Sequence, residues 1–297
     1  MVFAAVASAA ASPLPAFSLT KSPCMSDGLA KEHTQSAMVS LPSSHKWRMV
    51  IAYDGTKFAG WQYQQSPPTI QCLIEDALTR ATKLCRKELC LVGASRTDAG
   101  VHAWGQVAHF VTPFMFDSLD TLHAALNGLL PQEIRVREIS PVQPQFHARF
   151  STTSKTYHYK IYNHAIMDPF RCLFAYHTHN DRLGNPVKEI FCLDIVETGA
   201  VLQLEVEGSG FLFRQVRNMV ALLLQIGREA LPADVVPQII SARDRKELAK
   251  VALSAPPHGL CLMSVNYNSD ILEPPQGCPP SSFGRTHSVS KCKLPFY

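Results

Sequence analysis

The segment that follows Pro67-Pro68 leaves this chain few possible folds. Thr69 is a suitable helix N-cap, and beyond it apolar residues recur three and four positions apart. These residues are Ile70, Leu73, Ile74, Ala77, Leu78, Ala81, Leu84 and Cys85. The spacing predicts an amphipathic helix with one buried face. Because such a face must pack against a second layer, other segments of the chain have to supply that layer.

Strand-like segments stand on both sides of this helix. Residues Arg48 to Tyr53 form a short β-like run that ends at the turn dipeptide Asp54-Gly55. Beyond the helix we expect a strand at about 89–93, a loop at 94–103, a strand at 104–112, a helix at 118–130 and a strand at 133–139. This order differs from the strict alternation of a doubly wound sheet, so it favours an α+β fold.

The second half of the chain shows the same kinds of pattern. Lys155 to Tyr162 alternates apolar and polar residues, as a half-buried strand does, and Leu202 to Val206 does the same. Gly208-Ser209-Gly210 leads into a predicted helix at about 211–229, and Leu260 to Tyr267 is a final strand. We therefore predict an α+β fold with a mixed or antiparallel sheet flanked by helices, with halves at 46–150 and 151–268.

Composition excludes several classes of protein. The 297 residues are 46% hydrophobic and 18% charged, which is too apolar for a mostly disordered chain. No window approaches the roughly 20 apolar residues that a membrane span needs, so we expect no membrane association. The net charge of +4 is compatible with a polyanionic partner but does not establish one.

The cysteines and histidines point away from disulfide and metal chemistry. The nine cysteines contain no CxxC pair, which favours free thiols in a reducing compartment. The twelve histidines include His177-Thr178-His179, but no Cys/His spacing repeats a known metal pattern. We expect no metal site.

The two ends of the chain differ from its middle. Residues 1–45 are rich in Ala and Ser, lack Arg, and contain only Asp27 and Glu32 as acids. This composition favours a cleaved transit peptide, and the absence of Arg favours a plastid over a mitochondrion. An ordinary disordered extension and a weak secretory signal are the alternatives, and a cytoplasmic or nuclear protein is the alternative location. Residues 269–297 are rich in Pro and Ser and are predicted to be a disordered tail.

The loop between the strands at 89–93 and 104–112 is the best candidate for chemistry. It contains Ser95, Arg96, Thr97 and Asp98, and Gly93 and Gly100 bound these four residues. A carboxylate beside an arginine stays ionised, as a nucleophile or a base requires. The same residues also fit a simple turn with a surface ion pair, so spacing alone leaves both interpretations open.

Two residues of the second half are further candidates, and each has a structural alternative. Tyr157 presents a ring that can stack on a nucleobase, although many such tyrosines are core residues. Arg217 lies on the polar side of its predicted helix, where it can pair with a carboxylate or simply face solvent. The chain has no GxSxG, P-loop or GxGxxG motif, and Asp54 to Trp61 fits neither glycine template.

Taken together, these segments resemble the TruA-type tRNA pseudouridine synthases. The resemblance runs in order from about residue 48 to 267. The matching segments are Tyr53 to Trp61, Arg96 to Ala103, Phe146 to Arg149, Lys155 to Tyr159, Gly208 to Asn218 and Ala255 to Leu260. The resemblance implies two similar halves around a central RNA cleft.

The resemblance also implies a role for each candidate residue. Asp98 would be the catalytic aspartate, and Arg96 would help to displace the target nucleotide and hold the RNA. Tyr157 would stack on the uracil, Arg217 would pair with Asp98, and Leu260 would be an apolar wall beside the base. The family converts uridine to pseudouridine, usually in the anticodon stem and loop of tRNA, without metal or organic cofactor. It commonly works as a homodimer.

Two departures from the family pattern stand out. Ser95 occupies a position where many relatives carry Gly. The family also has several tens of residues that are missing here, so we expect an internal deletion near 175–185. Two functions from different classes follow: an active isomerase that tolerates the deletion, or a synthase-like RNA-binding protein or unstable product without turnover. A small-molecule lyase that uses Asp98 is a third alternative.

Overall fold

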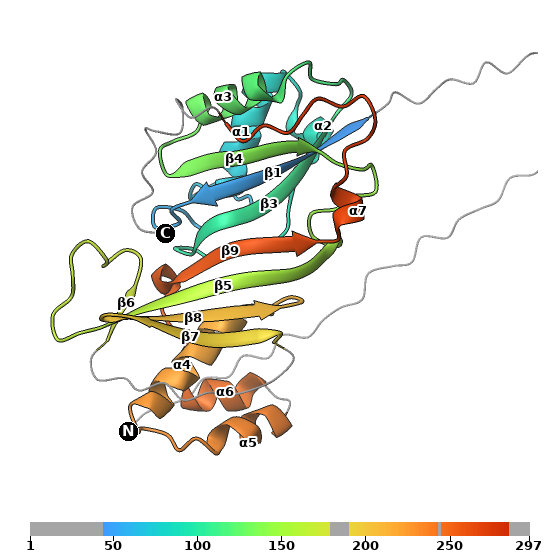
Figure 1. Cartoon of the computed structure of the whole chain (residues 1–297). Helices are drawn as coiled ribbons and strands as arrows, with labels where there is room; N and C mark the ends of the chain where they lie inside the picture. The colour runs from blue at the N-terminus through green and yellow to red at the C-terminus, as the bar shows by residue number, and fades with distance from the viewer. Residues whose placement is uncertain (1–43, 179–189, 243–244, 285–297) are drawn as a thin grey trace, which may run out of the picture. The chain divides into compact units, whose positions relative to one another are not determined.

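The computed structural model describes residues 44–178, 190–242 and 245–284 (Figure 1). The predicted leader, residues 1–45, lies outside these ranges except for its last two residues. The predicted deletion near 175–185 also lies mostly outside them, beyond residue 178.

One mixed sheet organises the described residues, and it confirms the predicted α+β class. Its strands run in the order β4-β1-β3-β9-β5-β8-β7, with β2 beside β3 and β6 beside β5. The strands are β1 (His45–Tyr53), β2 (Val92–Gly93), β3 (His102–Thr112), β4 (Ile134–Pro141), β5 (Thr152–Asn163), β6 (Tyr176–Thr178), β7 (Cys192–Thr198), β8 (Val201–Gly208) and β9 (Leu260–Tyr267).

The junction between β3 and β9 joins two antiparallel sets of strands. These two strands are parallel and pair through only two positions, His102 with Cys261 and Ala103 with Leu262. On the far side, β9 is antiparallel to β5 and places Leu262 opposite Tyr157. The start of β3, the middle of β5 and the start of β9 therefore meet at one place in the sheet.

The helices divide between the two ends of the sheet (Figure 1). They are α1 (Ile70–Thr82), α2 (Arg86–Leu89), α3 (Leu119–Leu129), α4 (Gln215–Gly227), α5 (Val235–Ala242), α6 (Arg245–Val251) and α7 (Ser269–Leu272), with a 3₁₀ turn η1 (Pro257–Gly259). Helices α1 and α3 lie at the β4-β1-β3 end, and α4, α5 and α6 lie at the β5-β8-β7 end (Figure 1).

Helix α1 forms as its periodicity predicts. The Thr69 hydroxyl caps it by accepting a hydrogen bond from the Cys72 N–H, and the chain turns out at Lys83 in the left-handed region (φ 63°). Ile70, Ile74 and Leu78 are fully buried in the core. Burial of each such side chain contributes about 1.5–3 kcal/mol, so this face attaches the helix firmly to the sheet.

Two predicted elements differ from the structure for local reasons. Only Val92 and Gly93 of the predicted strand at 89–93 pair in the sheet, because α2 precedes them and the Glu88 carboxylate caps that helix by accepting from the Cys85 N–H at 2.7 Å. The predicted helix at 211–229 begins only at Gln215, because Arg214 adopts a left-handed conformation (φ 58°) that a helix interior does not allow.

The predicted disordered tail is partly ordered, and this is a correction. Residues 269–284 are described: they form α7 and then return to the first half of the chain. Ser282 and Ile139 exchange two backbone hydrogen bonds of 2.8 Å, and Ser282 is 2% exposed. Its hydroxyl also bonds Asp120 at 2.6 Å and His123 at 2.9 Å. A composition rich in Pro and Ser did not reveal these long-range contacts.

Candidate active site

A cavity of about 390 Å³ opens at the sheet junction. Its lining comes from the residues that lead into β3, from β5 and Arg149 before it, from the stretch 211–216 before and at the start of α4, and from Leu260 at the start of β9. Because residues 95–101 contain the candidate catalytic residue Asp98, we call them the catalytic loop. Four of the five residues singled out from the sequence line this cavity, namely Arg96, Asp98, Tyr157 and Leu260.

The fifth residue, Arg217, does not line the cavity but pairs with Asp98, which does. Its Nη1 donates to Oδ2 of Asp98 at 3.0 Å, and its Nε donates to the Ala255 carbonyl at 2.6 Å. The Arg217 side chain is 9% exposed, whereas the Asp98 side chain is 22% exposed and borders the cavity. A buried guanidinium therefore supplies positive charge behind a carboxylate that an incoming ligand can reach.

Tyr157 and Leu260 give the cavity an apolar wall. Tyr157 is 7% exposed, and its ring meets Phe211 edge to face with centroids 5.2 Å apart. Its hydroxyl bonds the Ser95 hydroxyl at 2.8 Å. Burial raises the pKa of Tyr157 to about 12, with the Asp98 charge acting in the same direction and the Ser95 bond opposing it. The phenol is therefore neutral at physiological pH, and its side chain presents mainly a ring surface.

Basic side chains surround the rest of the cavity. Arg96 is exposed, while Arg149 and Lys155 reach back to the backbone that enters the catalytic loop. Lys155 Nζ donates to the Ala94 carbonyl at 3.0 Å, and Arg149 Nη2 donates to the Gly93 carbonyl at 3.4 Å. Burial lowers the pKa of Lys155, and the nearby Arg149 charge lowers it further. A cluster of cations of this kind favours an anionic ligand such as a nucleic-acid backbone.

Residues of the first half of the chain hold the catalytic loop in place through hydrogen bonds. The Trp61 N–H donates to the Thr97 carbonyl at 3.0 Å, and the Tyr53 hydroxyl bonds the Thr97 hydroxyl at 2.7 Å. Gly100 adopts φ +78°, a conformation that L side chains rarely adopt. Thr97 is therefore a structural member of the loop, whereas the next residue, Asp98, is partly exposed and borders the cavity.

Sequence reasoning missed part of the lining. Phe211, Leu212 and Phe213 border the cavity, and Leu212 and Phe213 remain 76% and 58% exposed. The helix predicted at 211–229 includes them, whereas in the structure they precede α4. The signal that distinguishes them is the run Gly208-Ser209-Gly210, which is more typical of a loop than of a helix entry.

Neither a metal cluster nor a membrane span is found within the described part of the chain. Among residues 44–178, 190–242 and 245–284, no three His, Cys, Asp or Glu side chains group as metal ligands. No helix in the same ranges is long and apolar enough to cross a membrane. Of the sequence His177-Thr178-His179, the last residue lies outside the described ranges.

A basic cavity with a paired carboxylate and an aromatic wall is typical of an enzyme that modifies nucleic acid. Comparison with known proteins agrees with that class. The family model for tRNA pseudouridine synthase matches residues 49–151 and 171–268, so the chain belongs to this family. Pseudouridine synthases are isomerases, and the chain is therefore an enzyme of that class.

Bacterial relatives match about three quarters of the chain. The tRNA pseudouridine synthase A 1 of Protochlamydia amoebophila (strain UWE25) is 38% identical over 256 residues, which is 76% of this chain and 98% of the relative. The tRNA pseudouridine synthase A of Syntrophotalea carbinolica is 36% identical, over 74% of this chain and 95% of the relative. That of Bacillus pumilus (strain SAFR-032) is 35% identical, over 75% of this chain and all of the relative.

Proposed function

We propose that this enzyme converts uridine to pseudouridine in the anticodon stem and loop of tRNA, with Asp98 acting directly on the target nucleotide. The observation that carries the proposal is the Asp98–Arg217 pair, which lies beside Tyr157 and Leu260 at one cavity. The relatives named tRNA pseudouridine synthase A support the nature of the substrate.

The chemistry requires a protected pocket. The C1′–N1 glycosidic bond breaks, the detached uracil rotates, and a C1′–C5 bond forms while the C5 proton leaves and N1 gains a proton. A uridine must leave its stack to undergo these steps, because its reacting atoms are not reachable inside a helix. The Asp98 carboxylate acts as a nucleophile or as a base, and both roles require its ionised form.

Each surrounding residue has a distinct proposed role. The ring of Tyr157 stacks on the uracil and Leu260 forms an apolar wall beside it, so that the base stays in place while it rotates. Arg217 pairs with Asp98 and orients its carboxylate. Arg96 is exposed at the rim, where it can occupy the space that the displaced nucleotide leaves and hold the RNA backbone. We also propose that the enzyme acts as a homodimer and needs no metal or organic cofactor.

The location of the modified uridine can be mapped directly. Purified enzyme would be incubated with unmodified tRNA transcripts, and pseudouridines located by carbodiimide treatment and primer extension. We expect stops in the anticodon stem and loop. Modification confined to another arm of the tRNA would contradict this part of the proposal. Sedimentation of the same preparation would show whether it is a dimer.

An RNA-binding protein without turnover is the second candidate function, and the comparisons provide a specific reason to test it. The alignment with the Protochlamydia relative runs over 256 residues but covers only 76% of this 297-residue chain. Because the aligned part of this chain is shorter than the alignment, the relative contains residues that this chain lacks. Loss of a packed segment can cost more than the stability of about 5–15 kcal/mol that a domain has. A cooperative thermal transition with tRNA binding but no product would favour this second function.

We further propose that the leader directs the protein to the plastid. The support is the composition of residues 1–45, with its many Ala and Ser residues and no Arg. A fusion of residues 1–45 to a fluorescent protein is expected to accumulate in plastids of plant cells. Mitochondrial or cytoplasmic fluorescence would contradict this assignment.

A further inference from the structure

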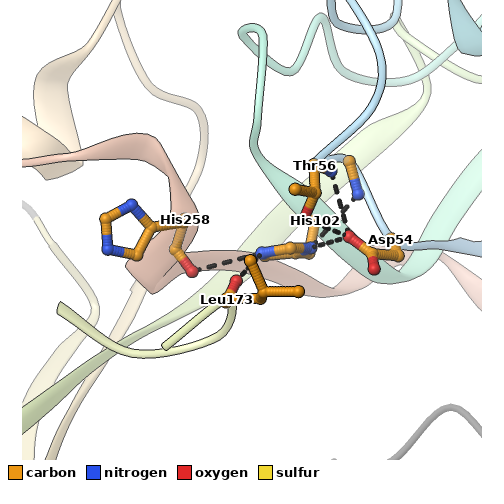
Figure 2. A network of polar contacts seen from close by, with 6 residues as sticks. Asp54, Thr56, His102, Leu173 and His258 are labelled. Carbon is orange, nitrogen blue, oxygen red and sulfur yellow. Dashed lines mark hydrogen bonds and ion pairs between the residues drawn. The ribbon is translucent and has the colours of Figure 1, made fainter. Parts of the chain in front are cut away.

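A buried histidine begins the strand that directly follows the catalytic loop. His102 is the first residue of β3, four positions after Asp98, and it is fully buried. Figure 2 shows its ring in a network of polar contacts with the turn after β1, the segment before β6 and the turn before β9. None of the roles described above uses this side chain.

Both nitrogens of the ring have backbone partners. The Gly55 N–H lies 3.1 Å from Nδ1. On the other side, Nε2 lies 3.0 Å from the Leu173 carbonyl and 3.2 Å from the His258 carbonyl (Figure 2). Carbonyl oxygens only accept hydrogen bonds, so Nε2 carries a proton. The ring therefore contacts backbone groups of three separate segments.

Asp54 lies beside this ring and has other donors. Its Oδ1 is 3.1 Å from Nδ1 (Figure 2). The same oxygen accepts from the Thr56 N–H at 3.0 Å and from the Thr56 hydroxyl at 2.6 Å. Burial would raise the pKa of this carboxyl, but the contacts with His102 and Thr56 lower it to about 2. The carboxylate therefore connects its own turn to the histidine.

The segments that His102 binds are those that enclose the catalytic loop. Residues 55–61 lie on one side: the Phe58 carbonyl accepts from the Gly100 N–H at 3.4 Å, and Gly55 is so close that a Cβ there would lie 2.0 Å from the Val101 carbonyl oxygen. On the other side, a Cβ on Gly100 would lie 3.1 Å from the ring of Pro257 in η1. One imidazole thus connects both flanks of the loop.

We propose that His102 is a positioning residue for Asp98. The His102 ring holds the turn 55–61 and η1 at a fixed separation, and this separation fixes the position of the catalytic loop between them. Its bond to the Leu173 carbonyl also attaches the segment before β6 to the same point. The inference rests on the proposed function only in that Asp98 is the group positioned. The hydrogen bonds that carry it are independent of the activity.

Two substitutions separate the two sides of the ring. In His102→Asn the amide reaches roughly as far as Nδ1 and can still accept from Gly55, whereas in His102→Gln it reaches toward Nε2 and can still donate to the carbonyls. We expect each variant to lower kcat about 10- to 100-fold while KM for tRNA changes less than about threefold, because the loop is displaced but the RNA-binding surface is intact.

His123 provides a matched control. It is 1% exposed, and its ring bonds the Ser282 hydroxyl at 2.9 Å and the Val136 carbonyl at 2.7 Å, but it does not line the cavity. We expect His123→Asn and His123→Gln to lower the melting temperature without lowering kcat at a temperature where every variant is folded. A fall in kcat equal to that of the His102 variants would overturn the proposal.

A second measurement does not depend on turnover. Hydrogen–deuterium exchange followed by mass spectrometry is expected to show faster exchange in peptides that cover residues 97–101 in the His102 variants, and no change there in the His123 variants. Unchanged exchange in the His102 variants would overturn the positioning role. If the parent chain produced no pseudouridine but exchange still increased, the proposed function would fail while the positioning role would stand.

Discussion

Arg217 and Asp98 are 119 positions apart in the sequence and form an ion pair of 3.0 Å at the cavity. The same arginine exchanges two hydrogen bonds with Ala255, because its Nε donates to the Ala255 carbonyl and its own carbonyl accepts from the Ala255 N–H. Helix α4, the segment before η1 and the catalytic loop are thereby connected through one side chain.

Arg217→Lys tests whether this geometry matters beyond its charge. Lysine keeps the positive charge but lacks the planar fork that reaches Asp98 and Ala255 together. We expect kcat to fall about 10- to 100-fold, with a smaller effect on tRNA affinity. Arg80→Lys, at an exposed position on α1, is the control and is expected to leave kcat unchanged. Activity equal to the parent in Arg217→Lys would show that charge alone suffices.

Tyr157 is expected to act through its ring. Because burial raises the pKa of its hydroxyl to about 12, this group is neutral over the working pH range and Tyr157→Phe loses only the Ser95 bond. We expect Tyr157→Phe to retain kcat/KM within about fivefold. Tyr157→Ala removes base stacking of about 1–3 kcal/mol and should lower kcat/KM at least tenfold. Equal losses in the two variants would instead assign the role to the hydroxyl.

His109 is expected to make the fold sensitive to mild acid. It is 5% exposed, and its Nδ1 accepts from the Ala148 N–H at 3.1 Å. Burial, with smaller contributions from the charges of His147 and Lys46, lowers its pKa to about 4. Since the folded state resists the proton that the unfolded chain accepts, this contribution to stability is present above about pH 6.5 and is lost as pH falls toward 4.

His109→Gln removes this titration. The parent should lose up to about 3 kcal/mol of unfolding free energy from this residue between pH 6.5 and 4, and the variant should show a flatter dependence. Urea melts at pH 7.5, 6 and 5 measure the difference. The same slope in both proteins would mean that other groups dominate the acid response.

Ser282 is expected to stabilise the fold from the ordered end of the chain. Its hydroxyl bonds both Asp120 and the buried His123, so Ser282→Ala removes a partner of a buried imidazole and should cost about 1–3 kcal/mol. The neighbouring Phe283 is 68% exposed, and Phe283→Ala should change stability by less than about 0.5 kcal/mol. Denaturant midpoints compare the two variants. If both variants had the parent's midpoint, this segment would add nothing to stability.

Local patterns predicted the elements whose cause is local. The 3.6-residue spacing after Thr69 predicted α1, and the alternation in Lys155 to Tyr162 predicted β5, because in each case one face of the element is buried. Helix α2 was not predicted, because it depends on a single cap at Cys85. The bend at Arg214 was not predicted, because no sequence pattern indicates that an arginine will adopt the left-handed conformation.

The candidate site was predictable by residue type but not by arrangement. The motifs named Asp98, Tyr157 and Arg217, and the structure brings them together only because β3 and β9 pair in parallel through two positions. That pairing joins residues more than 150 positions apart and has no local signature. The exposed Leu212 and Phe213 are a different case, because their exposure follows from where α4 begins, and the run Gly208-Ser209-Gly210 is the one signal of a loop before it.

Release of tritium from C5-labelled uridine in tRNA, compared between the parent chain and Asp98→Asn, tests the proposed function at its chemical step. The substitution keeps the shape of the side chain and removes its charge, and the variant should still bind tRNA. We expect release by the parent and a fall of about 10³-fold or more in the variant, because the carboxylate acts on the nucleotide itself. Release at the parent's rate by Asp98→Asn would contradict the assignment of Asp98, and no release by a folded, tRNA-binding parent would contradict the activity.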